Sequence, residues 1–358
     1  MAAPPAPPRP TETSGLRAGA AALLRVGPHA GAHRVALRAG VSVGVPLLVL
    51  TLSGHVSWAI YGAFGAFASV YGRDHARPER AGMQLQAGLV LTACLVLGSA
   101  VALLPGERWW MVVVGSVVAA GGTLLADALR WHPPGPLFMV FGFAAAATVP
   151  GRPHLVAVAA VVGLASAAFA VLVGSFRPWH GMAAPRLPRP DFAAALHRPG
   201  ARAHLLRYLV APLIAGGSAT ALGWGHPYWA MVGAVVPMAA PDALGRVVRA
   251  TQRMIGTVIG LAVAALLLWG QPHGVVAVLL VALLQTAVEL LIGRNYAAAL
   301  VFVTPLALLM GQLARPLPVD VLLRDRAVET ALGVAVAIAA TLATRDRLSG
   351  LGRAGQPS

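Results

Sequence analysis

The stretch Gly225-His226-Pro227-Tyr228-Trp229-Ala230-Met231-Val232-Gly233-Ala234 decides the fold, because the chain carries a second, degenerate copy of it. The copy, Gly54-His55-Val56-Ser57-Trp58-Ala59-Ile60-Tyr61-Gly62-Ala63, lies 171 residues earlier and agrees at six of the ten positions, the His and the Trp among them. Each copy opens an apolar run and is followed by a short basic segment. A repeat at an offset near half the chain length predicts two structural halves.

The amino-acid composition indicates that these halves lie in a lipid bilayer. Hydrophobic residues make up 58% of the chain and charged residues only 11%, against about 25% charged residues in a soluble domain. The net charge of +15 could indicate a nucleic-acid partner, but all 27 basic residues are Arg and most of them lie between apolar runs. That distribution is typical of cytoplasmic loops of membrane proteins and argues against nucleic acid.

Twelve apolar runs have the length of a transmembrane helix, about 20 residues, although several are shorter. We therefore expect an all-α polytopic membrane protein of about twelve transmembrane helices in two six-helix repeats. Six spans per half is an even number, so the repeats are predicted to be parallel. The expected parts are a disordered tail (1–35), a first membrane half (36–175), a Pro/Arg linker (176–205), a second membrane half (206–344) and a second tail (345–358).

The Arg distribution predicts the orientation of the spans. With the N-terminus in the cytoplasm, 22 Arg fall on the cytoplasmic side and five fall outside, and Arg326 is counted among the five. This bias predicts a multi-pass protein of the plasma membrane whose tails and linker are cytoplasmic.

Motifs of common enzymes and cofactor sites are absent from the sequence, which contains no metalloprotease HExxH, no Walker A loop, no dinucleotide fingerprint and no nucleophile elbow. The lone Cys94 excludes a disulfide framework, and the His29 and His33 pair has no third metal ligand. We therefore expect no cofactor, no metal and no enzymatic activity. The alternative of a membrane-embedded enzyme acting on a lipid-linked substrate would depend on His75 beside Asp74.

Carboxylates inside apolar spans are costly and are functional candidates by default. Glu289 is the first candidate for proton coupling, because Gln285 lies one turn before it and a buried carboxylate favours its protonated form. The alternative for Glu289 is a helix-end ion pair with Arg294. Asp127 lies in the matching place of the first half, where a pair with Arg130 is the alternative. Glu329 is the third candidate.

The two His-x-x-Trp copies are expected near the outer ends of the second and eighth spans. Trp58, Trp229 and Tyr228 are candidates to stack on an aromatic ligand, with His55 and His226 supplying a pH-sensitive charge. The alternative is an aromatic belt at the membrane interface, which needs no ligand.

The basic segments after the two copies have helical spacing. Guanidinium groups on one helix face attract carboxylates to a cytoplasmic mouth, and the alternative is that they only anchor the topology. The residues concerned are Arg77, Arg80, Arg246, Arg249 and Arg253.

Several motifs of the second half together resemble a known family. They are Trp229-Ala230, the run Arg246-x-x-Arg249-Ala250-x-x-Arg253-x-x-Gly256-Thr257-x-x-Gly260, Glu289 with Arg294-Asn295-Tyr296, Thr304-Pro305-Leu306-Ala307-Leu308, and Arg326-x-x-Glu329-Thr330-x-x-Gly333. This pattern resembles the fusaric acid resistance family of aromatic acid exporters. The resemblance implies a permease that moves organic or aromatic carboxylates outward, with Asn295 and Tyr296 among the candidate binding residues. Many relatives carry a large cytoplasmic domain between the halves, whereas this chain has only the linker.

The sequence therefore favours a proton-coupled permease for small organic anions. An anion channel of the same fold is the first alternative, and the membrane enzyme is the second. A homo-oligomer is compatible with the sequence.

Overall fold

The computed structural model of the chain describes residues 27, 31–176, 184–240 and 242–344. These parts of the chain form helices and contain no strand, which confirms the all-α class. His29 and the expected tail 345–358 lie outside the described residues, and only parts of the expected tail 1–35 and of the linker 176–205 fall within them.

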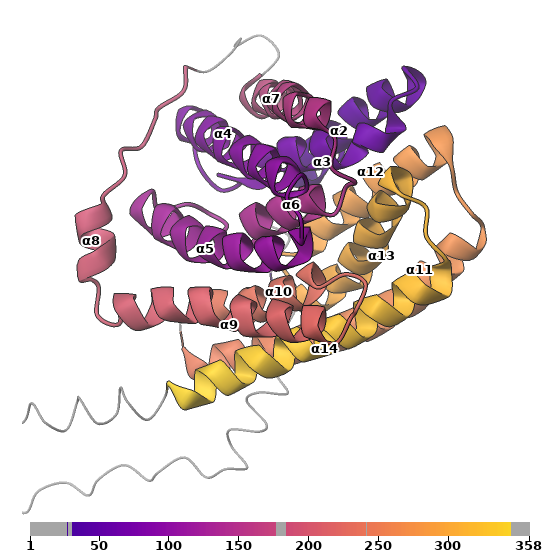
Figure 1. The fold of residues 1–358 in the computed structure, drawn as a ribbon. Helices are drawn as coiled ribbons and strands as arrows, with labels where there is room; N and C mark the ends of the chain where they lie inside the picture. The colour runs from indigo at the N-terminus through magenta and orange to yellow at the C-terminus, as the bar shows by residue number, and fades with distance from the viewer. Residues whose placement is uncertain (1–26, 28–30, 177–183, 241, 345–358) are drawn as a thin grey trace, which may run out of the picture.

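The first half is drawn in indigo to magenta in Figure 1. Its elements are α2 (Ala32–Leu52), α3 (Ala59–Ala66) between the 3-10 turns η1 (Val56–Trp58) and η2 (Phe67–Val70), α4 (Arg77–Val101), α5 (Glu107–Ala128), α6 (Leu137–Ala147) and α7 (Pro153–Ser175). The short helix α8 (Phe192–His197) stands apart at one side of the bundle, on the way to the second half (Figure 1).

The second half follows in pink to yellow and has the same sequence of long and short helices. Its elements are α9 (Ala201–Ala221), α10 (Tyr228–Val235) with the 3-10 turn η3 (Val236–Ala239), α11 (Ala243–Trp269), α12 (Gly274–Leu291), α13 (Tyr296–Ala314) and α14 (Val319–Ala343).

Each of the twelve expected spans has a helical counterpart, but the helices differ in their capacity to cross a membrane. Eight described helices are long and apolar enough, namely α2, α4, α5, α7, α11, α12, α13 and α14. The segments Val56–Val70, Leu137–Ala147 and Tyr228–Ala239 are apolar but short. The structure is thus that of a multi-pass membrane protein, and the count of twelve transmembrane helices stays a prediction.

Two helices begin earlier than their apolar runs indicate. The ninth apolar run of the sequence starts at about residue 253, but the corresponding helix α11 begins at Ala243, where the Asp242 side chain accepts a hydrogen bond from the Gly245 N–H (2.6 Å). Similarly, α14 begins at Val319 and not near 327, so the prediction that Arg326 lies in an outer loop was wrong. Hydropathy places the start of such a helix too late, because charged residues lower the local hydropathy. In these helices the charged side chains point into the protein, where other groups contact them.

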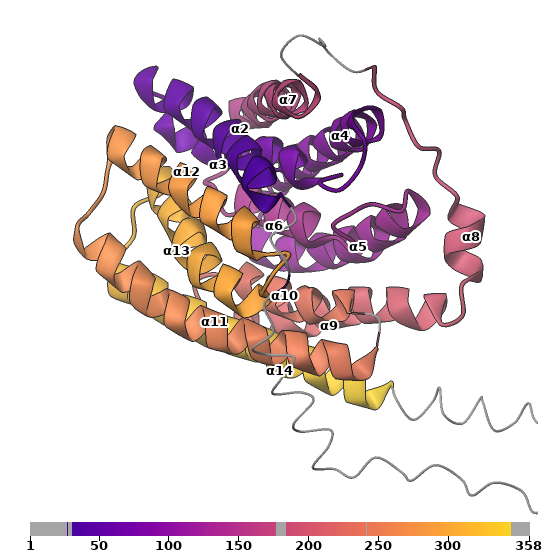
Figure 2. The same ribbon diagram turned by 180° about the vertical axis from the view of Figure 1, so that it is seen from behind.

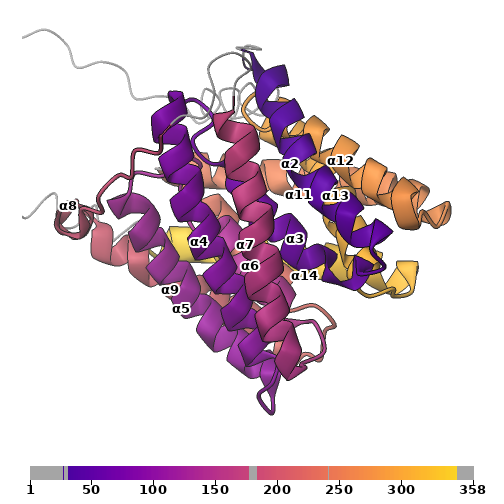
Figure 3. The same ribbon diagram turned by 90° about the horizontal axis from the view of Figure 1, so that it is seen from above.

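Corresponding helices of the two halves make corresponding contacts. In each half the last helix packs on the short second helix and on the third helix, as α7 does on α3 and α4, and α14 on α10 and α11. Figure 3 shows α4 and α7 running side by side. Between the halves, α2 packs on α12 and α5 packs on α9 (Figure 2). These pairings support two six-helix repeats, which remain a prediction.

The short helices approach their neighbours closely through glycine. A Cβ at Gly65 of α3 would collide with the backbone of Gly163 in α7, and one at Gly333 of α14 would collide with the backbone of Ala230 and Gly233 in α10. Both short helices then tighten into a 3-10 turn and end in an extended residue, Tyr71 or Ala240. Backbone that departs from the α-helix is thereby kept inside the bundle, away from its surface.

Candidate functional site

A cavity of about 360 Å³ lies between the halves. Its walls come from α3, η2, α6, α9, α10, η3, α11, α12, α13 and α14, together with the loops at residues 73, 132–136 and 292–293. Most of the wall is aliphatic or aromatic, including Phe64, Phe141 and Val232. We call this space the arginine cavity, because Arg73, Arg249, Arg253 and Arg326 also line it.

Arg253 and Arg326 are the two guanidinium groups buried most deeply in this wall. Arg253 of α11 is 2% exposed and Arg326 of α14 is 1% exposed. Within the described residues, Nε and Nη2 of Arg253 and Nε and Nη1 of Arg326 have no hydrogen-bond partner. A buried charge without a partner is costly, so these N–H groups favour an anion in the cavity.

Two of the guanidinium groups make cation–π contacts with aromatic rings. The Cζ atom of Arg326 lies 3.8 Å from the centre of the Trp229 ring, and that of Arg249 lies 4.6 Å from the centre of the Tyr296 ring. Cation–π contact offsets part of the cost of burial while it leaves the N–H edges free to bind an acceptor. The arrangement therefore presents flat aromatic surface next to hydrogen-bond donors.

Glu289 lies on the α12 wall of the same cavity and is 3% exposed. Arg73, from the turn after η2, places Nη2 at 3.1 Å from Glu289 Oε2, and Gln285 Nε2 donates to Glu289 Oε1 at 3.4 Å. The expected neighbour Gln285 is therefore present. The alternative pair with Arg294 is not formed, since Arg294 Nε donates to the Gly27 carbonyl (3.2 Å). Among the described lining residues Glu289 is the only carboxylate, so four Arg leave the cavity strongly positive.

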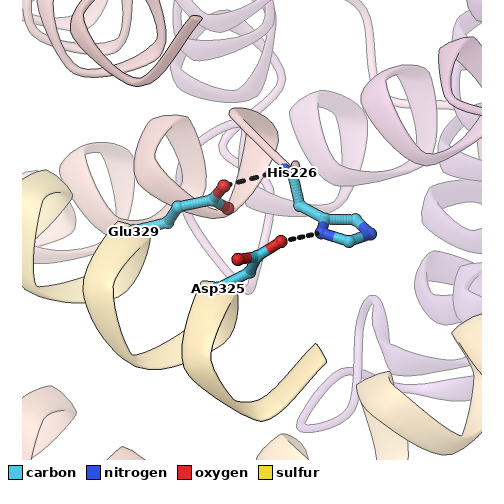
Figure 4. Close-up of side chains that lie close together, drawn as sticks. All are labelled: His226, Asp325 and Glu329. Atoms are coloured by element: carbon cyan, nitrogen blue, oxygen red, sulfur yellow. Dashed lines mark hydrogen bonds and ion pairs between the residues drawn. The ribbon is translucent and has the colours of Figure 1, made fainter. Parts of the chain in front are cut away.

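The repeated motif of the second half forms one end of the cavity and is tied to α14. The His226 N–H donates to Glu329 Oε1 (2.7 Å), and Nδ1 of its ring lies 2.9 Å from Asp325 Oδ2. Figure 4 shows the two carboxylates on successive turns of α14, both facing His226. Together with Trp229 on Arg326, these contacts fix the turn that leads into α10 at three points.

A second cavity, of about 430 Å³, lies beyond this turn. Its lining includes Glu107, Arg108, His226 and Arg315, and the loop around residues 148–151. We call it the vestibule. The loops that line the vestibule lie at one end of the helix bundle, and the loops that line the arginine cavity lie at the other end. The two spaces are therefore at opposite ends of the bundle.

The two cavities share a thin layer of wall residues, which we call the septum. Its members are Ile60, Ala145, Tyr228, Trp229, Ala307 and Gly311. Phe141 packs against it from α6, with its ring 5.1 Å from that of Trp229 and stacked on Tyr228 at 6.1 Å. The septum separates the arginine cavity from the vestibule at the depth of the short helices.

Seven of the candidate residues named from sequence line these spaces. Tyr228 and Trp229 line both cavities, and Arg249, Arg253, Tyr296 and Glu289 line the arginine cavity. His226 lines the vestibule.

The copy in the first half is used differently, since His55 and Trp58 line neither cavity. The exposed His55 ring packs on Trp58 at 4.1 Å, outside the septum.

The basic residues of α4 also lie away from the cavities. Arg80 donates from Nε and Nη2 to the Gly174 carbonyl (3.1 and 2.8 Å) and from Nη1 to the His75 carbonyl (3.2 Å). Arg77 does not contribute to either lining. This half therefore uses Arg80 to join α7 to the segment before α4.

Four other candidates have identifiable structural partners. Arg246 Nε donates to the Ala240 carbonyl (3.1 Å), and Asn295 Oδ1 caps α13 by accepting from the Ala298 N–H (2.9 Å). Glu329 belongs to the α14 cluster described above. Asp127 is paired with two residues other than the expected Arg130.

Asp127 lies near the linker side of the second half. Its carboxylate is 3.7 Å from Arg198 Nη1 and 3.9 Å from His204 Nε2. Both partners are distant in sequence, so helical spacing could not indicate them. The other polar pair considered, Asp74 with His75, is a surface feature, because Asp74 is 73% exposed and lies 3.9 Å from His132.

Sequence reasoning missed Arg73, Asp325 and Arg326 as site residues. Arg326 and Asp325 precede Glu329 by three and four residues, so a helix extended backwards from Glu329 would have placed all three on one face. Arg73 lies in a loop, and no local pattern marks it.

Comparison with known families finds a match to part of the second half. The family described as fusaric acid resistance protein-like matches residues 214–340, which contain every Arg, Glu and aromatic group of the second-half wall described above. Residues 214–340 are therefore similar to this family. The chain is a multi-pass membrane protein whose second half resembles this family.

One curated relative is also a membrane protein. An uncharacterized membrane protein of Bacillus subtilis (strain 168), YvaC, is 36% identical over 107 residues, which are 30% of this chain. The chain spans only 17% of that relative's length. No solved structure matches the chain significantly.

Proposed function

We propose that the protein is a permease of the plasma membrane that exports small organic carboxylates, aromatic acids included, through the arginine cavity and the vestibule. The observation that carries the proposal is the pair Arg253 and Arg326, whose unpartnered N–H groups face an apolar cavity. Donors next to flat rings suit a carboxylate attached to an aromatic body. The volume of about 360 Å³ lies in the range of small-molecule sites, about 300–1,000 Å³.

The proposed architecture has twelve membrane passages in two parallel halves, with both tails and the linker in the cytoplasm. In it, α3, α6 and α10 cross only part of the hydrocarbon layer and meet at the septum. Interrupted helices are tolerated at membrane depth where they are buried in protein or line a cavity. Cysteine at Gly54 and Gly225 should react with an impermeant thiol reagent from outside, while cysteine at Arg77 and Arg246 should not. Opposite labelling of the two halves would exclude parallel repeats.

Proton coupling is assigned to Glu289 in this proposal. Arg73 can hold the ionised carboxylate and Gln285 can accept a hydrogen bond from the protonated one, so both forms have a partner. Such a group can load and release a proton as substrate passes the cavity.

The test is flux in liposomes that contain the purified protein. A labelled aromatic acid such as 4-hydroxybenzoate is supplied with and without an imposed pH gradient, and empty liposomes serve as the control. Accumulation against the anion gradient supports the permease. Passive anion current without accumulation would indicate the channel, and turnover of a lipid-linked substrate without flux would indicate the enzyme.

A further inference from the structure

The turn before α10, taken together with the first two residues of that helix, Tyr228 and Trp229, combines two properties. It supplies Tyr228 and Trp229 to the septum, and it is attached to α14 through Asp325, Arg326 and Glu329. Movement of this turn would join the vestibule to the arginine cavity. The α14 side chains that hold the turn therefore also hold Tyr228 and Trp229 in the septum.

The holding groups include two carboxylates in close proximity. One oxygen of Asp325, one of Glu329 and a ring nitrogen of His226 all lie within 4.8 Å of one another. Asp325 is 7% exposed and Glu329 is fully buried. Two buried carboxylates at this separation repel each other when both are ionised, so the binding of a proton to one of them stabilises the cluster.

Glu329 Oε2 is the atom available to receive that proton. Oε1 accepts the His226 N–H, whereas Oε2 is buried and has no hydrogen-bond partner among the described residues. The charged and titratable groups around it come from four places. They are Asp325 and Arg326 of α14, His226 of the preceding turn, Tyr228 of α10 and Arg108 of α5. Arg326 directs its guanidinium face to Trp229, so it does not form an ion pair with Glu329 in this structure.

We propose that Asp325, Glu329 and His226 form a proton-binding site on the vestibule side that sets how firmly α14 holds the septum. A proton from vestibule water binds Glu329 Oε2, and the O–H bond replaces a negative charge. The His226 N–H then loses a charged acceptor, and hydrogen bonds to charged groups are roughly twice as strong as neutral ones. A second proton, on Asp325, removes the charge from the acceptor of the His226 ring contact in the same way.

The inference rests on the proposed function only in taking the septum as the barrier on the substrate path. It differs from the role of Glu289, which lies on the other side of that barrier. Acid on the vestibule side is expected to loosen the turn and expose the arginine cavity to that side.

The experiment measures thiol accessibility across the septum. Val232 of α10 lines the arginine cavity and not the vestibule, so Val232→Cys in a Cys94→Ala background reports whether the septum is open. Membrane vesicles are exposed to an impermeant thiol reagent on the vestibule side, at about pH 7.5 and about pH 5.5. That side is defined by labelling of Thr148→Cys in the vestibule wall. We expect the Val232→Cys rate, corrected for the thiolate fraction by the Thr148→Cys rate, to rise about tenfold at the lower pH.

The variants Glu329→Gln and Asp325→Asn, tested singly, should abolish this pH response and give a fast rate at both pH values. His55→Gln, in the exposed first-half copy, and Asp320→Asn, at an exposed position of α14, are the matched controls and should keep the response. Unchanged Thr148→Cys labelling shows that each variant is folded. An equal corrected rate at both pH values in the parent, or a response that survives both carboxylate substitutions, would overturn the proposal. The assay contains no substrate, so pH-dependent labelling without anion flux would leave the proton site standing and remove the permease.

Discussion

The two halves share their helix arrangement and differ in what their polar side chains do. In α4, Arg77, Arg80 and Gln84 have the spacing that Arg246, Arg249 and Arg253 have in α11. Gln84 is as buried as Arg253, but its amide donates to the carbonyls of Ser69 and Tyr71 (3.1 and 3.3 Å). The first half gives Arg80 and Gln84 backbone acceptors, while the second half directs Arg249 and Arg253 into a cavity.

The last helices of the halves show the same contrast more strongly. Both α7 and α14 pack on a short helix through glycine, but α7 contains no Asp, Glu or Arg. In α14, Asp325, Arg326 and Glu329 are all buried. The second half thus supplies most of the charged side chains of the arginine cavity, and the first half adds Arg73, so matched substitutions in the two halves should have unequal effects.

The largest difference is expected when Arg253 is converted to the residue that stands at its place in α4. Arg253→Gln removes a buried charged donor from the arginine cavity, and such hydrogen bonds contribute about 1.5–3 kcal/mol. Anion affinity should fall about 10- to 150-fold. Equilibrium binding of a labelled aromatic acid measures the change, and Arg152→Gln, at an exposed position, should leave affinity unchanged. Equal affinities of Arg253→Gln and the parent would remove the cavity as the anion site.

The second comparison is between Glu289 and Asp127. Glu289→Gln should retain anion binding and lose accumulation driven by a pH gradient, which for one proton per anion is about tenfold per pH unit. Asp127→Asn should retain both, because Asp127 is paired near the linker with Arg198 and His204. Flux into liposomes with an imposed pH step distinguishes them. Accumulation by Glu289→Gln at the parent level would reduce Glu289 to an ion-pair partner of Arg73.

The third comparison separates transport from stability at Arg249 and Arg80. Arg249→Ala should lower transport about fivefold, since a contact of roughly 1 kcal/mol with the anion is lost, and should change stability little. Arg80→Ala leaves the Gly174 carbonyl without its donor and should destabilise the fold by about 1–3 kcal/mol. Thermal unfolding in detergent and flux per folded molecule measure the two effects. A transport defect of Arg80→Ala with unchanged stability would contradict the assignment.

The smallest difference concerns the two repeated Trp residues. Trp229→Phe keeps a ring over Arg326 but weakens the cation–π contact by about 0.5–1 kcal/mol, which corresponds to a two- to fivefold loss of affinity. Trp58→Phe should change affinity by less than this, because Trp58 lines neither cavity. The same binding assay checks both variants, and equal losses would indicate that the two copies act alike.

The sequence predicts the helices of this protein better than the contacts between residues that are far apart in the chain. The repeat, the helical runs and the contact between Gln285 and Glu289 follow from spacing along the chain. Arg73 and Glu289 lie 216 positions apart, so only the packed fold brings them together. Arg326 was assigned to a loop because hydropathy treats every charge as exposed.

Repetition also has a limit as a guide to function. The two His-x-x-Trp copies look equivalent in sequence, yet only the second has carboxylates opposite its His. That difference arises in α14 and α7, about 100 residues further along the chain. The sequence of the copy itself therefore gives no sign of it.

The packing of α2 on α12 has a consequence for synthesis of the protein. The chain between Leu52 and Gly274 has to be translated before the partner of α2 exists. At about 5–20 residues per second, the first helix waits roughly 10–45 s. During this interval the apolar surface of α2 keeps the helix in the lipid. Gly40, which is buried in the finished fold, does not yet have its α12 neighbours. Assembly of the bundle is therefore completed only after most of the polypeptide has been inserted.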